Sequence, residues 1–236
     1  TLALKAMDMR AGTEILGLAV ALGVGIGAGL ANYALIRALR IPPIIATLST
    51  SFVIMSTAIW ANRGLRIKPP ASLAELSTGA TLGVPNLALA AIALSIGAWW
   101  LLERSLYGRY VLAIGQNMRA ARFAGVPVDG VRLATYVLCA ALAALCGFLL
   151  SCFSGGAALN MGAEYLLMSI AVVVIGGTSV AGGDSNVPGI WGAALLMFLV
   201  VTMLNTYGLG AAFRLILTGL IIIAVIFAAG GRARRL

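Results

Sequence analysis

The stretch ILGLAVALGVGIGAGLANYALI, residues Ile15–Ile36, decides the fold class because its 22 residues include no charged side chain. A helix rises about 1.5 Å per residue, so this stretch is long enough to cross a hydrocarbon core of about 30 Å. Gly23, Gly25, Gly27 and Gly29 alternate with larger residues in its second half. The pair Gly25 and Gly29 predicts a face on which another membrane helix packs closely. A dinucleotide loop is the weaker interpretation, because no strand precedes the glycines and the third glycine of G-x-G-x-x-G is absent.

The composition of the whole chain agrees with a membrane protein. Of its 236 residues 61% are apolar and only 10% are charged, and the mean hydropathy is +1.05. A soluble domain is typically about 45–50% apolar and about 25% charged, so this chain could not cover a soluble core. The net charge of +9 comes from basic residues in short runs between apolar segments, which favours positive loops beside a membrane over a nucleic-acid surface.

Further apolar segments follow the first one along the chain. They predict an all-α, polytopic transmembrane helical bundle of about seven segments, the last two of which are short for full spans. The six later segments are Ile44–Trp60, Asn86–Leu102, Leu133–Phe153, Tyr165–Ile175, Ile190–Leu204 and Leu215–Ala229. The polar connection Ala61–Pro85 separates the second segment from the third.

The stretch Ala113–Pro127 is a polar island in this apolar sequence. Asn117 predicts a helix N-cap, Gly125 a left-handed residue after the helix, and Pro127 a stop. The helix between them, Met118–Ala124, is far shorter than the roughly 12–15 residues at which an isolated helix becomes marginal in water. We therefore expect another molecule, in our hypothesis a separate protein, to pack on it.

The distribution of Lys and Arg predicts the orientation. If the loop Glu103–Arg132 is cytoplasmic, ten of the 16 basic residues lie inside and six outside. The bias favours this orientation, although the connection Ala61–Pro85 carries three of the outer positive charges. Because the chain opens on Thr1, which would then lie outside, we expect further helices to precede it.

The sequence offers little for catalysis or metal binding. It has no histidine, and Cys139, Cys146 and Cys152 lack zinc-site spacing, so we predict three buried small side chains and no metal site. No pair of acidic residues shares a helix face inside a span, and Glu164 is predicted at the outer boundary.

The turn Gly176–Asp184 has the glycine spacing of a phosphate-binding loop at Gly177 and Gly182. Gly183-Asp184 stands where such a loop requires Lys and Ser or Thr. We interpret the stretch as a glycine-rich turn between two membrane helices and predict no ATP site in this chain.

The second apolar segment, Ile44–Trp60, is rich in hydroxyl side chains. These groups either bond to carbonyls of their own helix or line a wet path through the membrane, and the sequence leaves both open. The candidate pathway residues are Thr47, Ser49, Thr50, Ser51 and, on a later segment, Asn205.

Several motifs resemble one known family. Tyr107-Gly108-Arg109-Tyr110, Ala113-Ile114-Gly115-Gln116-Asn117 and Ala120-Ala121-x-x-Ala124-Gly125-Val126 are similar to the cytoplasmic coupling segment of ribose-type ABC sugar permeases. Arg40–Leu48, Tyr165–Ala171, Val173–Gly183 and the closing helix agree in the same order. Family members are longer at the N-terminus, and many have glycine where this chain has Gln116.

The resemblance implies a single transmembrane permease domain over residues 1–236, in the bacterial inner membrane, with residues 103–132 as its cytoplasmic coupling loop. It implies a second permease copy or paralogue, two cytoplasmic ABC ATPases that hold the ATP and Mg, and a periplasmic binding protein that delivers a monosaccharide or similar solute. The chain itself would be no enzyme, bind no cofactor or nucleic acid, and work by alternating access. A permease for branched-chain amino acids, a secondary transporter or channel, and an intramembrane enzyme are the alternatives.

The resemblance also implies which residues couple the chain to an ATPase. Small side chains at Ala120, Ala121 and Ala124 would allow close docking, and Arg119 and Arg122 would pair with acidic groups. The alternative is a helix held by anionic lipid headgroups. The full predicted coupling set is Gly115, Gln116, Asn117, Arg119, Ala120, Ala121, Arg122, Ala124 and Gly125.

Overall fold

The computed structural model describes residues 2–7, 14–62, 69–81, 83–158, 161–179 and 182–206, together with 216, 219 and 220. The chain divides into two compact units, and each is described separately. The first unit comprises Thr1–Leu102 and Pro127–Gly162, and the second comprises Glu103–Val126 and Ala163–Leu236. Helices dominate both units, as the sequence predicts.

The first unit holds most of the long helices. Its elements are α1 (Leu2–Met7), α2 (Glu14–Leu39), α3 (Pro43–Asn62), α4 (Ala71–Thr78), β1 (Ala80–Thr81), β2 (Val84–Pro85), α5 (Asn86–Glu103) and α8 (Val128–Phe153). β1 and β2 form a two-residue antiparallel hairpin in which Ala80 pairs with Pro85. The polar connection Ala61–Pro85 therefore contains a helix and a hairpin that the sequence analysis did not predict.

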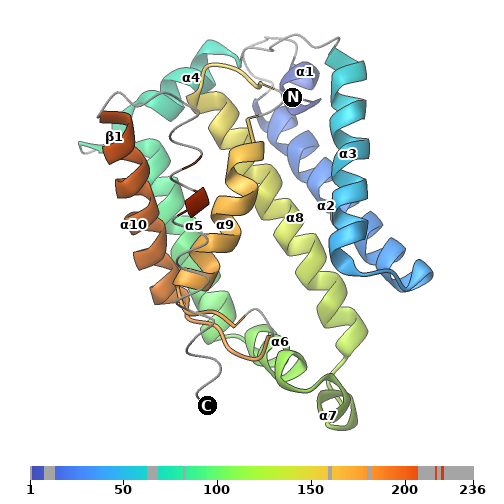
Figure 1. Cartoon of the computed structure of the whole chain (residues 1–236). Coiled ribbons are helices and arrows are strands. Elements are labelled where there is room, and N and C mark those ends of the chain that lie inside the picture. Colours follow the sequence, from blue (N-terminus) through green and yellow to red (C-terminus); the bar gives the residue numbers. More distant parts are fainter. Residues whose placement is uncertain are drawn as a thin grey trace. The chain divides into compact units, whose positions relative to one another are not determined.

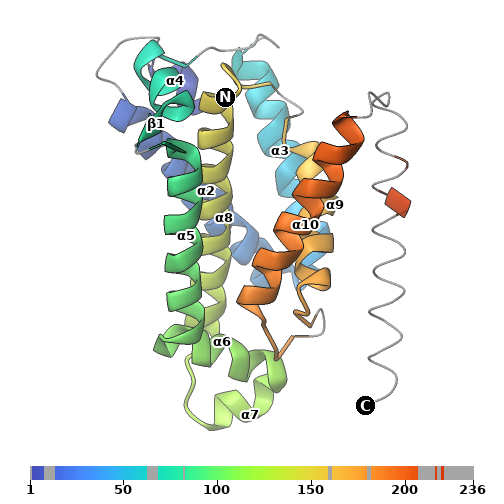
Figure 2. The ribbon, with the colours of Figure 1, turned by 90° about the vertical axis from the view of Figure 1, so that its left-hand side faces the viewer.

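The interface between α2 and α8 is the main contact of this unit, and the two helices run side by side in both views (Figures 1 and 2). Gly25 and Gly29 are buried in it. A Cβ on Gly25 would lie 2.8 Å from the carbonyl oxygen of Ala140, and one on Gly29 2.8 Å from that of Tyr136. The predicted helix-packing face is confirmed, since the missing side chains let the two backbones meet.

A small apolar cluster joins α1 to the C-terminal end of α8. Leu4 and Cys152 are each 2% exposed, and Phe148 is packed with them. The prediction of buried cysteines is correct for Cys152. It is wrong for Cys139 and Cys146, which are exposed on α8.

Five described helices are long and apolar enough to cross a membrane: α2, α3, α5, α8 and, in the second unit, α10 (Val187–Thr206). These agree with the predicted segments to within a few residues, except that α8 begins at Val128 rather than at Leu133. Its first turns carry Asp129 and Arg132, and because of these charges the predicted apolar segment starts too late. Except for residues 216, 219 and 220, the predicted segment Leu215–Ala229 lies outside the described residues.

The second unit consists of α6 (Leu106–Gln116), α7 (Met118–Phe123), α9 (Ala163–Ile175) and α10. α9 and α10 lie next to each other (Figure 2), and α9 is too short to be counted among the spans. Their contact again uses glycine: a Cβ on Gly176 would lie 2.7 Å from Cα of Ile190. The predicted loop Glu103–Arg132 thus contains two helices and the beginning of a third.

Candidate functional site

The short helix α7 begins at the cap that the sequence predicts. The side-chain oxygen Oδ1 of Asn117 accepts hydrogen bonds from the backbone N–H groups of Arg119 and Ala120, both at 3.0 Å. The backbone of Asn117 is extended, with φ −156°, as an N-cap requires. Two donors of the first turn that have no partner inside the helix are thereby satisfied.

The other end of α7 is closed by the predicted glycine. Gly125 has φ +82°, in the left-handed region where a Cβ is strained. The N–H of Val126 donates to the carbonyl of Ala121 at 3.0 Å, and the N–H of Gly125 donates to that of Arg122 at 3.1 Å. These two bonds form a Schellman motif, which leaves a helix of six residues held at both ends.

The side chains of α7 divide into an exposed set and a buried one. Phe123 is 92% exposed and Met118 is 43% exposed, although both are apolar. Ala120 and Ala124 are exposed as well, so they remain candidates for contact with a partner. Ala121 is only 5% exposed and packs against the chain itself, so of the three predicted alanines it is the one least accessible to a partner.

Phe123 is the residue of this site that the sequence reasoning missed. The predicted coupling set was based on small and basic side chains and did not include Phe123. The signal was present, because an aromatic residue in a helix too short to have a core of its own must find its contacts elsewhere. The other predicted residues on this helix, Arg119 and Arg122, are exposed.

α6 leads directly into α7, and the residue between them belongs to both helices. Ser105 caps α6 by accepting from the N–H of Gly108 at 3.2 Å. At the other end the N–H of Asn117 donates to the carbonyl of Ala113 at 3.1 Å, while its side chain starts α7. Asn117 thus ends α6 and begins α7, so the connection between the two helices is a single residue.

The C-terminal end of α6 meets the glycine-rich turn between α9 and α10. A Cβ on Gly115 would collide with the amide nitrogen of Gly183 and lie 3.0 Å from its Cα. A Cβ on Gly183 would lie 2.9 Å from Cγ of Gln116, whose Nε2 donates to the Gly183 carbonyl at 3.4 Å. Here two segments more than 60 residues apart meet backbone to backbone. We call this contact, formed by Gly115, Gln116, Gly182 and Gly183, the glycine joint.

The turn itself is bonded to the start of α10. Gly182 and Gly183 have φ +93° and +86°, and the N–H of Gly182 donates to the carbonyl of Ser179 at 3.1 Å. Asn186 is bonded on both sides: its N–H donates to Oγ1 of Thr178 at 3.4 Å, and its Oδ1 accepts from the N–H of Gly189 at 3.1 Å. The predicted turn is confirmed, but its contact with α6 was not foreseen.

The hydroxyls of α3 bond to their own helix. Thr47, Ser49, Thr50 and Thr57 each donate to a carbonyl three or four residues earlier, at distances from 2.7 to 3.1 Å. Ser51 is exposed, and Asn205 lies near the end of α10, in the other unit. The bonds satisfy the hydroxyl protons and leave oxygen lone pairs to accept from another molecule. The pathway assignment stays a prediction.

Among the described residues no group of three or more His, Cys, Asp or Glu side chains could hold a metal ion. The fold and the site together define a class of protein: a polytopic helical membrane protein with a capped short helix joined, through α6, to a turn between the apolar helices α9 and α10.

Comparison with known proteins identifies the family. The chain belongs to the family described as "Branched-chain amino acid transport system / permease component", whose model matches residues 2–226. Its apolar helices and its family place it in the bacterial inner membrane as a multi-pass protein. No solved structure matches it.

Three relatives illustrate the likeness. The autoinducer 2 import system permease protein of Klebsiella pneumoniae is 33% identical over 86% of this chain and 59% of its own length. A probable ABC transporter permease protein of Sinorhizobium fredii is 31% identical over 98% of this chain and 70% of its own. The ribose import permease protein of Escherichia coli is 28% identical over 90% and 68%. The chain thus spans less than two thirds of the length of the first of these relatives.

Proposed function

We propose that this chain is the transmembrane subunit of an ATP-driven ABC importer and carries a monosaccharide or similar small polar solute by alternating access. The family description mentions branched-chain amino acids, whereas the names of two of the relatives mention ribose and autoinducer 2. These names favour the sugar-type cargo over the amino-acid alternative. A second permease copy or paralogue and a periplasmic binding protein would complete the transport path.

The observation that carries the proposal is the exposed aromatic side chain on a helix capped at both ends. Phe123 is 92% exposed on α7, and moving such a side chain out of water is worth about 1.5–3 kcal/mol. Aromatic and Arg side chains are also enriched among the residues that dominate protein interfaces. We infer that Phe123 inserts into a cytoplasmic ATPase, with Arg119 and Arg122 beside it and Ala120 and Ala124 allowing close approach.

The glycine joint supplies the path by which an ATPase would move the membrane helices. Motion of α7 passes to α6 through Asn117, which caps both helices. It passes from Gly115 and Gln116 to Gly183 by backbone contact, and then to α9 and α10, between which that turn lies. Close-packed protein interiors are hardly compressible. Backbones in direct contact therefore transmit a displacement from one element to the next.

The hydroxyl-bearing residues Thr47, Ser49, Thr50 and Ser51, with Asn205, are the proposed contacts of the solute on its way. A sugar hydroxyl can donate to an oxygen that already donates to its own helix. Such contacts would be weak, as rapid passage requires. In this proposal ATP and Mg are held by the ATPase, and this chain binds neither.

The test uses the full-length protein in proteoliposomes with its ATPase and its periplasmic binding protein. We expect uptake to require ATP, and Phe123→Ala to abolish both uptake and the stimulation of ATPase activity by the binding protein. Phe153→Ala is the matched control, because Phe153 is also an exposed phenylalanine, 52% exposed at the C-terminal end of α8. Uptake driven equally well by an ion gradient without ATP would overturn the importer proposal. If instead the Phe123 variant transports normally, the docking assignment is wrong.

A further inference from the structure

The ends of three helices in the first unit surround a hollow of about 350 Å³. The C-terminal end of α2, the start of α3 and the first turns of α8 contribute its walls. We propose that this hollow binds the phosphate group of an anionic phospholipid. The site uses no residue of α7 or of the glycine joint and does not depend on the proposed transport function.

The charges in the hollow favour an anion. Three arginines, Arg37, Arg40 and Arg132, face one acid, Asp129, which leaves a net charge of two positive. Within the part of the chain that the structure describes, Arg40 and Arg132 have no carboxylate partner. Guanidinium groups match phosphate oxygens with two parallel hydrogen bonds, so a phosphate would be held from several sides.

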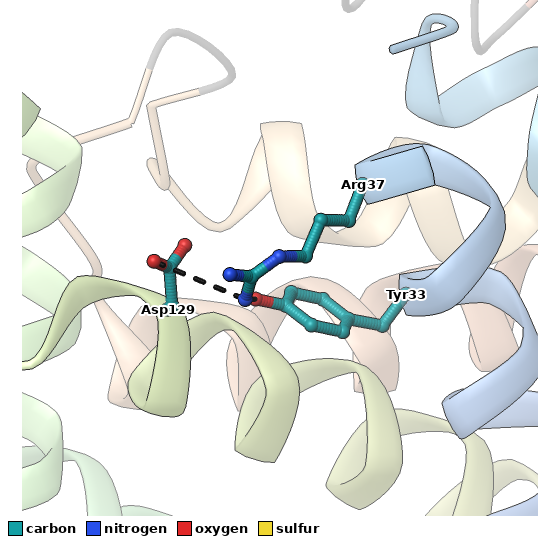
Figure 3. A network of polar contacts seen from close by, with 3 residues as sticks. All are labelled: Tyr33, Arg37 and Asp129. Atoms are coloured by element: carbon teal, nitrogen blue, oxygen red, sulfur yellow. Dashed lines mark hydrogen bonds and ion pairs between the residues drawn. The ribbon is translucent and has the colours of Figure 1, made fainter. Parts of the chain in front are cut away.

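The ion pair between Arg37 and Asp129 is weak enough to open. Nη1 of Arg37 lies 3.9 Å from Oδ2 of Asp129, and the two side chains are 63% and 52% exposed. The same Nη1 donates to the Tyr33 hydroxyl at 3.1 Å, as Figure 3 shows. Long, exposed pairs contribute about 0–1 kcal/mol, so a phosphate can compete with Asp129 for Arg37.

The backbone of Arg40 adopts a conformation that is energetically unfavourable for a residue with a side chain. Arg40 has φ +53°, and among the described residues it is the one non-glycine residue with positive φ. A side chain in the left-handed region costs roughly 1–2 kcal/mol, and such strain persists where function requires it. The first turn of α8 adds the partial positive charge of a helix N-terminus at the opposite wall.

The position of the hollow selects a lipid as the source of the phosphate. All three helices are long enough to span a membrane, so their ends lie at the boundary where headgroup phosphates are found. Exposed apolar side chains lie in the sequence on both sides of the turn that joins α2 to α3, at the last residue of α2 and in the first turn of α3: Leu39 is 59% exposed, Ile44 72% and Ile45 55%. They suit acyl chains and would be costly beside water alone. The orientation predicted from the basic residues puts this end on the cytoplasmic side, whose leaflet is anionic.

The test compares lipids on the purified full-length protein in detergent. Native mass spectrometry counts the bound molecules of phosphatidylglycerol and of phosphatidylcholine, and inorganic phosphate is the third probe. We expect phosphatidylglycerol to be retained and the other two not. Equal retention of both lipids, or phosphate binding as tight as that of phosphatidylglycerol, would overturn the proposal.

Variants assign the binding to this hollow. Arg40→Gln with Arg132→Gln should lower the retention of phosphatidylglycerol about tenfold or more, while Arg109→Gln, an exposed arginine on α6, should leave it unchanged. Asp129→Asn should raise the retention, because it removes the competing acid, and this gain cannot arise from misfolding. If the double variant keeps its lipid, or if it loses only affinity for the ATPase, the hollow is not a lipid site.

Discussion

Glycine brings two backbones together in two regions of this molecule, and the two contacts differ in kind. In the first region α2 and α8 cross as continuous helices, with Gly25 and Gly29 one turn apart on the same face. In the second, Gly115 near the end of α6 meets Gly183 in a turn. At the first contact the absence of side chains lets two long helices, α2 and α8, pack closely. At the second it lets the end of α6 touch the turn between α9 and α10.

The two contacts should respond differently to a substitution. The contact between α2 and α8, which we call the crossing, extends over successive helical turns. A substitution that disrupts it separates two long helices and therefore lowers the stability of the protein. The joint is one contact held by residues with positive φ and a single side-chain hydrogen bond of 3.4 Å. Its disruption should leave the helices folded and break the connection between them.

The largest effect is expected at the crossing. Gly29→Leu places a side chain against the backbone of Tyr136 and Val137, which cannot yield as a flexible side chain would. We expect a loss near the upper end of the typical 1–3 kcal/mol for overpacking, seen as a lower unfolding temperature and less monodisperse protein in detergent. Gly27→Leu is the matched control, because nothing lies within 4 Å of a Cβ at Gly27. Equal behaviour of the two variants would contradict the interface.

The next effect is expected at the joint. Gly115→Ala should reduce the ATPase stimulation by the periplasmic protein about tenfold, since about 1.4 kcal/mol of misfit is within the range for overpacking. The unfolding temperature should fall less than in Gly29→Leu, because a contact at one turn is disturbed and not the packing of two long helices. Gly192→Ala in α10, where a Cβ meets nothing within 4 Å, is the control. Stability and coupling lost together would show that the joint is another structural contact like the crossing.

A smaller effect is expected at the cap that connects α6 to α7. Asn117→Ala removes the acceptor for two backbone N–H groups and should cost about 1 kcal/mol of helix stability, or about fivefold in the affinity for the ATPase. Asn117→Asp keeps the acceptor and should bind as before. The measurement is the affinity of each variant for the purified ATPase, and equal loss in both would indicate that the amide itself contacts the partner.

The smallest effect is expected in α3, which contributes no residue to either glycine contact. Thr50→Val and Thr57→Val remove hydroxyls with the same bond to the carbonyl four residues back. Neither should change the unfolding temperature much. Only Thr50 is a proposed pathway residue, so its variant should raise the KM for uptake about two- to threefold, as expected for one weak neutral hydrogen bond. If the two variants transport alike, Thr50 does not line the path.

Much of the fold could be predicted from local chemistry. Apolar length marked the membrane helices, and the i, i+4 pair of Gly25 and Gly29 marked the packing face. Asn117 and Gly125 marked both ends of α7 to within one residue. Two errors arose because charge and span length were used alone. The charged residues Asp129 and Arg132 were assigned to a loop but belong to α8, and α4 and α6 lie in stretches that were predicted to be connections.

The sequence by itself determined the class of this protein, because composition, span length and helix caps depend on neighbours along the chain. Only the tertiary structure decided which side chains of α7 face outward, that Phe123 is exposed while Ala121 is buried, and that Gly183 rests on Gly115. It also brought Arg132 together with Arg37 and Arg40 around one hollow. Such contacts join residues far apart in sequence, and their geometry depends on how the helices pack rather than on any local pattern.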